Sequence, residues 1–427
     1  MNKGKKVSDL KTITNDFIHA IEEGNLEKVN QLLDSVLLDE SPEIQYDLSQ
    51  LLLQYGFVEQ GSRVLEHLHY IFPDEVQITI DYASTLIDLE KEEEALDLLM
   101  AIDESAPEYP QSLLLLADFY QMQGLFEVAE HYINEALEVL PEEPLLLFAK
   151  AELLFEIGKF AEAARIYELL YEEAAEISGV NLAERLAEVY RVGGSYETAL
   201  QYYMKTLEDK VTADLLFGSA YCAFQCEKYE LAIKQLEDLK ALDSDYFSGY
   251  LLLAESYAML EENERAYTII QEGISRDVFE KTFYLFAGKM AIKLKNPEEA
   301  IKHLQEAIAL DPEYMEAILT LTSIEHQMED YDSIIERFEN LKQEQFDWVA
   351  LYPFVADAYA KNERYDRAYE IYKSAYNELK EDVSFLEDYC YFLIEYGKRG
   401  EAREVVERLI ELQPTEVHWL DLLETLD

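Results

Sequence analysis

The seven histidines and three cysteines are the side chains of this sequence best suited to bind a metal or to act as nucleophiles. Their spacing does not predict such a site, because no His-Glu-x-x-His arrangement occurs and no histidine pairs with a cysteine at zinc-like spacing. Cys222 and Cys226 are four residues apart, on one face of an expected helix, but no third ligand lies nearby. We expect small core residues in a reducing cytosol and no bound metal.

Carboxylates are far more numerous, with 89 Asp and Glu residues. At this density pairs at i and i+4 are inevitable, so two neighbouring carboxylates give almost no evidence for acid-base catalysis. No glycine-rich phosphate loop is present, and Gly193-Gly194-Ser195 reads as a turn. The sequence therefore predicts a protein that is not an enzyme and has no cofactor.

The charge balance narrows the choice of partners. Only 35 Lys and Arg oppose the carboxylates, which gives a net charge of -54. Such a surface repels nucleic acid and anionic lipid, so neither is expected as a direct partner. No apolar run approaches the ~20 residues of a membrane helix, and the basic residues 1–6 precede Val7-Ser8-Asp9 in place of a signal peptide's apolar core. We expect a cytoplasmic protein.

The secondary structure that would position any binding residue is predicted by a repeat in the sequence. Hydrophobic residues make up 49% of the chain, whereas only 15 Gly and 10 Pro are present, which favours helices over a many-stranded sheet. Alanines that open an apolar run recur at spacings of 34, 34, 36, 33, 34, 34, 68 and 34 residues, at Ala95, Ala129, Ala163, Ala199, Ala232, Ala266, Ala300, Ala368 and Ala402. Ile334 fills the skipped place, and Gly61 and Val29 extend the series backwards to twelve repeats.

Two further positions keep the same register. The residue twelve before each of these is small in eleven of twelve repeats, and the residue four after is always apolar. Glycines recur between the two segments in half the repeats, at Gly24, Gly56, Gly124, Gly158, Gly194 and Gly397. This pattern predicts two helices per repeat, joined by a tight turn and crossing closely at the small residues.

The 34-residue period and the unit from Leu113 to Pro141, with Ala117, Gly124 and Ala129, resemble the tetratricopeptide repeat family, and within it the bacterial cytosolic proteins with many repeats. The resemblance implies an all-α solenoid, a right-handed superhelix of about twelve helix-turn-helix repeats. We expect a basic tail at residues 1–9, the repeat array at 10–416 and a C-terminal capping helix at 417–427. The expected repeat starts lie near residues 10, 42, 76, 110, 144, 180, 213, 247, 281, 315, 349 and 383.

The spacing of 36 residues between Ala163 and Ala199 contains Ser178-Gly179. One interpretation is a local change in the superhelical path, with a weak subdomain break near residues 178–180. The other is that two additional residues lengthen one helix.

The resemblance also implies a concave groove, lined by the second, fifth, ninth, twelfth and thirteenth positions of each first helix. The groove residues selected on this basis are Leu114, Asp118, Phe148, Glu152, Phe155, Glu184, Glu188, Arg191, Phe217, Tyr221, Phe224, Leu251 and Glu255. Acidic residues stand where chaperone-binding members of the family carry the asparagine that grips a C-terminal carboxylate, so that function is not expected.

Aromatic anchors among carboxylates suit a basic or amphipathic segment of a protein partner. We therefore expect a protein-binding scaffold, whose partner belongs to the nucleic-acid-handling machinery. One alternative is a peptide-sensing regulator that changes superhelical shape. In another, the phenylalanines are core residues and the carboxylates only keep the chain soluble.

Overall fold

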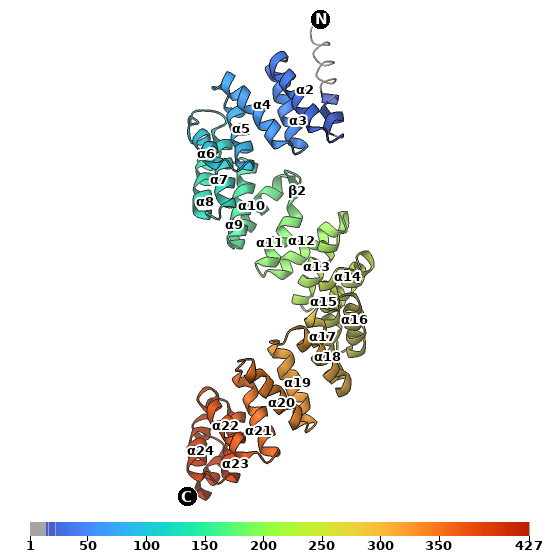
Figure 1. Ribbon diagram of the computed structural model, residues 1–427, viewed down its shortest axis with the longest axis vertical. Coiled ribbons are helices and arrows are strands. Elements are labelled where there is room, and N and C mark those ends of the chain that lie inside the picture. The colour runs from blue at the N-terminus through green and yellow to red at the C-terminus, as the bar shows by residue number, and fades with distance from the viewer. Residues whose placement is uncertain (1–13, 16, 22, 427) are drawn as a thin grey trace. The chain divides into compact units, whose positions relative to one another are not determined.

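The computed structural model describes residues 14, 15, 17–21 and 23–426, and the expected basic tail at residues 1–9 lies outside them (Figure 1). The chain forms two compact units, which are described separately: unit 1 ends at Val211 and unit 2 begins at Thr212. Within the described residues, the only strands are the two of a short hairpin. The predicted all-α fold is confirmed.

Consecutive helices pair antiparallel along each unit (Figure 1). In unit 1 the helices are α2 (Leu26–Asp39), α3 (Pro42–Gln54), α4 (Val58–Ile71), α5 (Val76–Asp88), α6 (Glu92–Met100), α7 (Tyr109–Met122), α8 (Phe126–Val139), α9 (Pro144–Glu156), α10 (Phe160–Glu173), α11 (Leu182–Val192) and α12 (Tyr196–Asp209).

The helices of unit 2 continue the same alternation. They are α13 (Ala213–Gln225), α14 (Tyr229–Leu242), α15 (Phe247–Met259), α16 (Asn263–Arg276), α17 (Lys281–Lys293), α18 (Pro297–Leu310), α19 (Met315–Gln327), α20 (Tyr331–Gln343), the 3₁₀ helix η1 (Val349–Leu351), α21 (Tyr352–Lys361), α22 (Tyr365–Leu379), α23 (Val383–Glu395), α24 (Arg399–Leu412) and α25 (Val417–Thr425).

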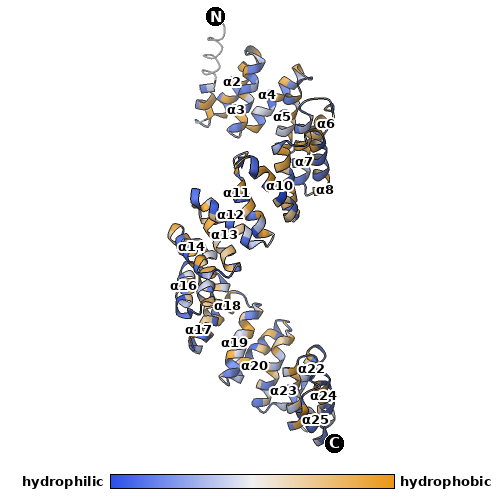
Figure 2. Cartoon of the chain, turned by 180° about the vertical axis from the view of Figure 1, so that it is seen from behind, coloured by the Kyte–Doolittle hydropathy of each residue, from blue (hydrophilic) through white to orange (hydrophobic). Residues whose placement is uncertain are grey.

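The small residues of the repeat lie at the helix crossings. All nine register alanines are fully buried. A Cβ atom added at Gly288 on α17 would come within 2.8 Å of Leu304 Cγ on α18, and Leu304 is the apolar residue four positions after Ala300. A larger side chain at these positions would separate the helix axes. The small residues identified from the sequence therefore lie where the helices pack most closely. Hydrophobic and hydrophilic residues alternate around the helices accordingly (Figure 2).

Each turn between the two helices of a repeat contains one residue with positive φ. The six predicted glycines hold this position, with φ between 63° and 80°. In the other six repeats a charged residue adopts the same conformation, at Glu90, Glu227, Glu261, Lys295, Glu329 and Glu363. The turn geometry is therefore kept even where the side chain disfavours it, since a left-handed conformation costs an L-residue roughly 1–2 kcal/mol.

The additional residues near 178 form a hairpin inside unit 1. Strands β1 (Glu176–Ile177) and β2 (Val180–Asn181) pair antiparallel, and Ser178 and Gly179 between them both have positive φ. Asn181 then caps α11, because its side chain accepts hydrogen bonds from the backbone N–H groups of Ala183 and Glu184. Helix α10 is 14 residues long, as are α8 and α12. The interpretation that the two additional residues lengthen one helix is therefore wrong.

Helix α25 packs one face on the end of unit 2. Trp419 is 4% exposed, and its indole N–H donates to Gln413 Oε1 at 2.9 Å. Val417 and Leu420 remain exposed on the other side. Among the helices that the structure describes, none is both long enough and apolar enough to span a membrane.

Candidate functional site

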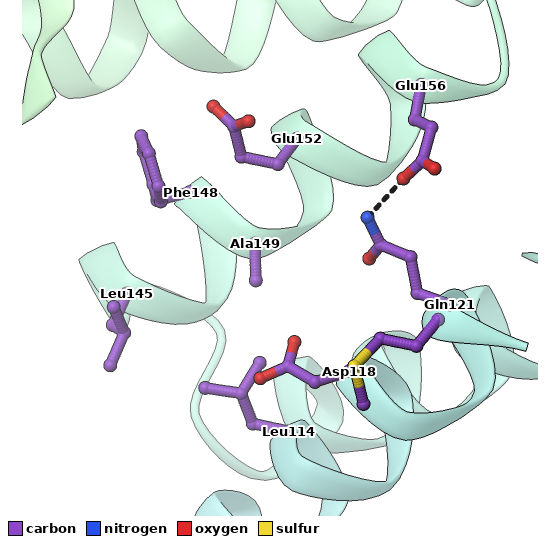
Figure 3. A pocket seen from close by; sticks show the side chains of 9 residues that line it. Leu114, Asp118, Gln121, Leu145, Phe148, Ala149, Glu152 and Glu156 are labelled. Carbon is purple, nitrogen blue, oxygen red and sulfur yellow. Dashed lines mark hydrogen bonds between the residues drawn. The ribbon is translucent and has the colours of Figure 1, made fainter. Parts of the chain in front are cut away.

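Four of the predicted groove residues come together in one pocket of unit 1. Helix α7 contributes Leu114 and Asp118, and helix α9 contributes Phe148 and Glu152 (Figure 3). The pocket has a volume of about 460 Å³. Its apolar walls and acidic side chains are the combination that the sequence predicts for a basic ligand.

Five other residues complete the lining, and the groove selection made from the sequence omits them. They are Gln121, Met122, Leu145, Ala149 and Glu156. Four of the five occupy the second, twelfth or thirteenth position of a first helix, so the family positions already pointed to them. Only Ala149 lies outside those positions. Gln121 donates a side-chain hydrogen bond to Glu156 and so links the α7 and α9 sides of the pocket (Figure 3).

Asp118 is the carboxylate of the pocket that has no protein partner. No described residue makes a hydrogen bond or an ion pair with it, and its side chain points into the space between α7 and α9 (Figure 3). Water reaches the carboxylate, but the surrounding groove walls exclude enough solvent to raise the pKa of Asp118 to about 6. A cation placed beside this group would remove the penalty that burial imposes on its charged form.

Glu152, in contrast, is already neutralised by a neighbouring side chain. Arg185 on α11 donates to both carboxylate oxygens of Glu152, with Nε at 2.6 Å from Oε1, and the Tyr167 hydroxyl donates to Oε1 at 2.5 Å. The Arg185 guanidinium also lies over the Phe155 ring, 4.4 Å from its centroid. Glu152 therefore holds α9, α10 and α11 together and is not free to take a ligand cation.

Glu188 on α11 is also paired with an arginine and a tyrosine, but its arginine lies three residues on in the same helix. Arg191 donates to it from Nη2 at 2.6 Å and from Nε at 3.0 Å, and the Tyr203 hydroxyl donates at 2.9 Å. Burial acts to raise the pKa of Glu188, but the hydrogen bonds from Arg191 and Tyr203 outweigh it and lower that pKa. Glu184 lies 3.4 Å from Lys210 Nζ. The groove of unit 1 thus uses most of its carboxylates for pairing within the chain.

In unit 2 the predicted aromatic residues pack against neighbouring tyrosines. Phe217 lies 5.2 Å from Tyr246, and Phe224 lies 5.5 Å from Tyr229, between ring centroids. The predicted residues of α13 and α15 are all half-buried; they are Phe217, Tyr221, Phe224, Leu251 and Glu255. They are therefore neither core residues nor fully exposed.

Glu255 on α15 is the counterpart of Asp118 in unit 2. Burial raises its pKa, and Lys289 opposes that shift. No described residue makes a hydrogen bond or an ion pair with the Glu255 carboxylate at contact distance.

Tyrosine-carboxylate hydrogen bonds between repeats are a feature that the sequence analysis missed. The tyrosine three residues after the small residue of a first helix donates to a glutamate on the preceding second helix: Tyr190 to Glu168 at 2.7 Å, Tyr257 to Glu237 at 3.2 Å and Tyr359 to Glu339 at 2.5 Å. Burial and this hydrogen bond together raise the pKa of Tyr359 to about 12. The 31 tyrosines and the repeat register together contained this signal.

The comparisons with known proteins agree with this architecture. Models described as YpiA-like tetratricopeptide repeats match residues 121–175 and, for the C-terminal repeats, 351–416, and a Coatomer epsilon subunit model matches residues 186–373. Hsp70-Hsp90 organizing protein 1 of Glycine max is 24% identical over 51% of this chain and 39% of its own length. The crystal structure of YrrB, described as a TPR protein with an unusual peptide-binding site, is 20% identical and covers 44% of this chain and 95% of its own, with a TM-score of 0.37.

One relative is similar along nearly the whole chain. The TPR repeat-containing protein YpiA of Bacillus subtilis (strain 168) is 38% identical over 408 residues, which cover 94% of this chain and 95% of that protein. Together with the helix pairs of both units, this similarity assigns the chain to the YpiA-like family of tetratricopeptide repeat proteins.

Proposed function

We propose that this protein is a non-enzymatic interaction scaffold that binds a basic segment of a partner protein in the pocket between α7 and α9. Tetratricopeptide repeat proteins generally mediate protein-protein interaction, and the chain belongs to that class. The observation that carries the proposal is Asp118, an unpaired carboxylate in a pocket whose walls are Leu114, Leu145 and Phe148.

Electrostatics support a cationic ligand at this place. No Lys, Arg or His is among the residues that line the pocket, and its other two carboxylates, Glu152 and Glu156, already accept hydrogen bonds from Arg185 and Gln121. An arriving Lys or Arg would find one free carboxylate and an apolar wall for its methylene stem. The net charge of -54 would attract such a segment over a longer range, and salt would weaken that attraction.

A peptide-display selection on the immobilised full chain tests the proposal. We expect the wild-type chain to enrich peptides that contain Lys or Arg, with retention that falls as salt rises. Asp118→Asn should lose these peptides, because the substitution removes the free charge and keeps the shape.

The matched control is Glu138→Gln, which makes the same charge change on an exposed residue of α8 outside the pocket. It should behave like the wild type. Enrichment of peptides without basic residues, or equal retention by Asp118→Asn, would overturn the proposal.

A further inference from the structure

A second pocket continues the first one toward the N-terminal ends of α7 and α9. Its volume is about 290 Å³, and Leu114 and Leu145 line both pockets. The residues found only in the second pocket are Pro107, Glu108, Pro110, Gln111, Leu140, Glu143 and Leu146. The two pockets are therefore halves of one groove that follows the helix axes.

The two halves differ in chemistry. The second pocket has leucine and proline walls, and two of these leucines, Leu140 and Leu145, are 43% and 42% exposed. Its two carboxylates, Glu108 and Glu143, belong to the segments that precede α7 and α9. The first pocket presents the free Asp118 carboxylate. One half thus suits an apolar side chain, and the other suits a cation.

The close packing of α7 and α9 decides how a ligand meets the groove. Cα atoms of α7 and α9 approach within 8 Å of each other. These two helices pack against each other, so the backbone of a ligand lies on their surface and only its side chains enter the two pockets. An extended chain in the polyproline II conformation has three residues per turn, so its residues i and i+3 point to the same side.

The spacing of the two halves follows from the helix rise. Gln111 in the second pocket and Asp118 in the first are seven residues apart on α7, which corresponds to about 10 Å along the axis. A polyproline II segment covers about 9 Å in three residues and returns the side chain to the same side. We infer that the groove selects an extended segment in which an apolar residue and a Lys or Arg are three positions apart. This inference rests on the proposed function and adds the sequence pattern of the partner.

Synthetic peptides test the spacing on the full chain by fluorescence polarisation. The probes carry one Leu and one Arg in a Gly-Ser background, in either order, separated by zero, one, two or four residues. A matched set replaces Arg with Gln. We expect the tightest binding with two intervening residues, by about tenfold over the probe with none.

Two variants of the groove test which pocket binds the Leu and which binds the Arg of the peptide. Asp118→Asn should weaken the Arg probe about tenfold and leave the Gln probe unchanged. Leu140→Ser, at an exposed residue of the second pocket, should weaken both probes equally, and Glu138→Gln should change neither. Circular dichroism of each variant confirms that the helices are retained.

The outcomes separate the inference from the proposed function. Binding that depends on Asp118 but is indifferent to the Leu-Arg spacing, or to Leu140→Ser, would overturn the inference and leave the proposed function intact. If the Arg probes bind no better than the Gln probes, the proposed function itself is wrong.

Discussion

Arg337 on α20 donates from both terminal nitrogens to the carboxylate of Glu325 on α19, with both N–O distances at 2.5 Å, and Glu325 is only 3% exposed. The pair lies between the two helices of one repeat, where Arg337 Nη1 also lies 3.4 Å from the Thr322 hydroxyl. A charge buried this deeply is tolerated because the half-buried Arg337 pairs with both of its oxygens.

Removing one member of this pair should destabilise unit 2. We expect Arg337→Met to cost about 3–5 kcal/mol, because Glu325 would be left buried without a partner. The double variant Glu325→Leu/Arg337→Met should restore most of the loss, since both charges are then gone. Hydrogen exchange of the α19 and α20 amides, read by mass spectrometry, measures the effect locally. A double variant as unstable as Arg337→Met would show that the loss comes from the missing ion pair itself and not from leaving Glu325 buried without a partner.

The alanines at the helix crossings should not accept larger side chains. Ala129→Leu in unit 1 and Ala266→Leu in unit 2 should each cost about 1–3 kcal/mol, because both sites are fully buried at a close helix approach. Urea unfolding monitored by circular dichroism gives the change. Val128→Leu, one residue away and 36% exposed, is the size-matched control and should be nearly neutral. Tolerance of leucine at both alanines would contradict the register.

Replacing a charged turn residue that has positive φ with glycine should stabilise the folded chain. Glu261→Gly should stabilise the chain by roughly 0.5–1 kcal/mol, because glycine adopts the 61° φ of this turn without steric cost. The reverse type of change, Gly158→Ala at a φ of 80°, should destabilise the chain by about 1–2 kcal/mol. Thermal melts of the two variants provide the comparison, and opposite signs are the expected result.

Asp118→Asn should stabilise the free protein at neutral pH. The folded-state pKa of about 6 lies above the ordinary value near 4, so the folded chain holds more protons than the unfolded chain between these values. Stability from this group is therefore lost as pH rises from about 4 to about 6, and the Asn variant avoids that loss. The gain in urea midpoint over the wild type should be larger at pH 8 than at pH 5. Lower pH is impractical, because the isoelectric point is near 4.3.

Glu152 should behave in the opposite way to Asp118. Glu152→Gln should destabilise unit 1 by about 1–3 kcal/mol, because Arg185 and Tyr167 both lose a charged acceptor. Glu152→Lys should cost more, since it places a second cation beside Arg185. Chemical denaturation of both variants against Asp118→Asn distinguishes a structural carboxylate from a ligand-binding one. Equal effects at the two positions would contradict this division.

The repeat register was predictable because it follows from sterics that recur every 34 residues. Small residues at the crossings, apolar residues one helical turn later and glycines in the turns are each visible in single residues such as Ala300, Leu304 and Gly158. The turns at Glu227 and Glu261 were not predictable, because the surrounding helices impose a positive φ that the residue type disfavours. The hairpin at Ser178-Gly179 needed the backbone pairing that only the structure shows.

The position of the candidate site was predictable from the sequence, but which of its carboxylates pair with other side chains of the chain was not. The family positions led to Leu114, Asp118, Phe148 and Glu152, which line one pocket. They did not distinguish Asp118 from Glu152, because the difference comes from Arg185, a residue of the next repeat at a position that the groove rule leaves out. Which carboxylate is free depends on contacts between repeats, and those contacts are set by packing in three dimensions.

The charged turns of unit 2 have an electrostatic consequence. Glu227, Glu261, Glu329 and Glu363 occupy the same place in successive repeats, with Lys295 between them, so these charges form a row along one edge of the unit. Only Glu227 with Glu261 and Glu329 with Glu363 are like-charged neighbours, because Lys295 lies between the two pairs. The members of each pair repel each other, whereas Lys295 attracts the glutamates on either side of it, and salt screens both effects, with a Debye length of about 8 Å at physiological ionic strength.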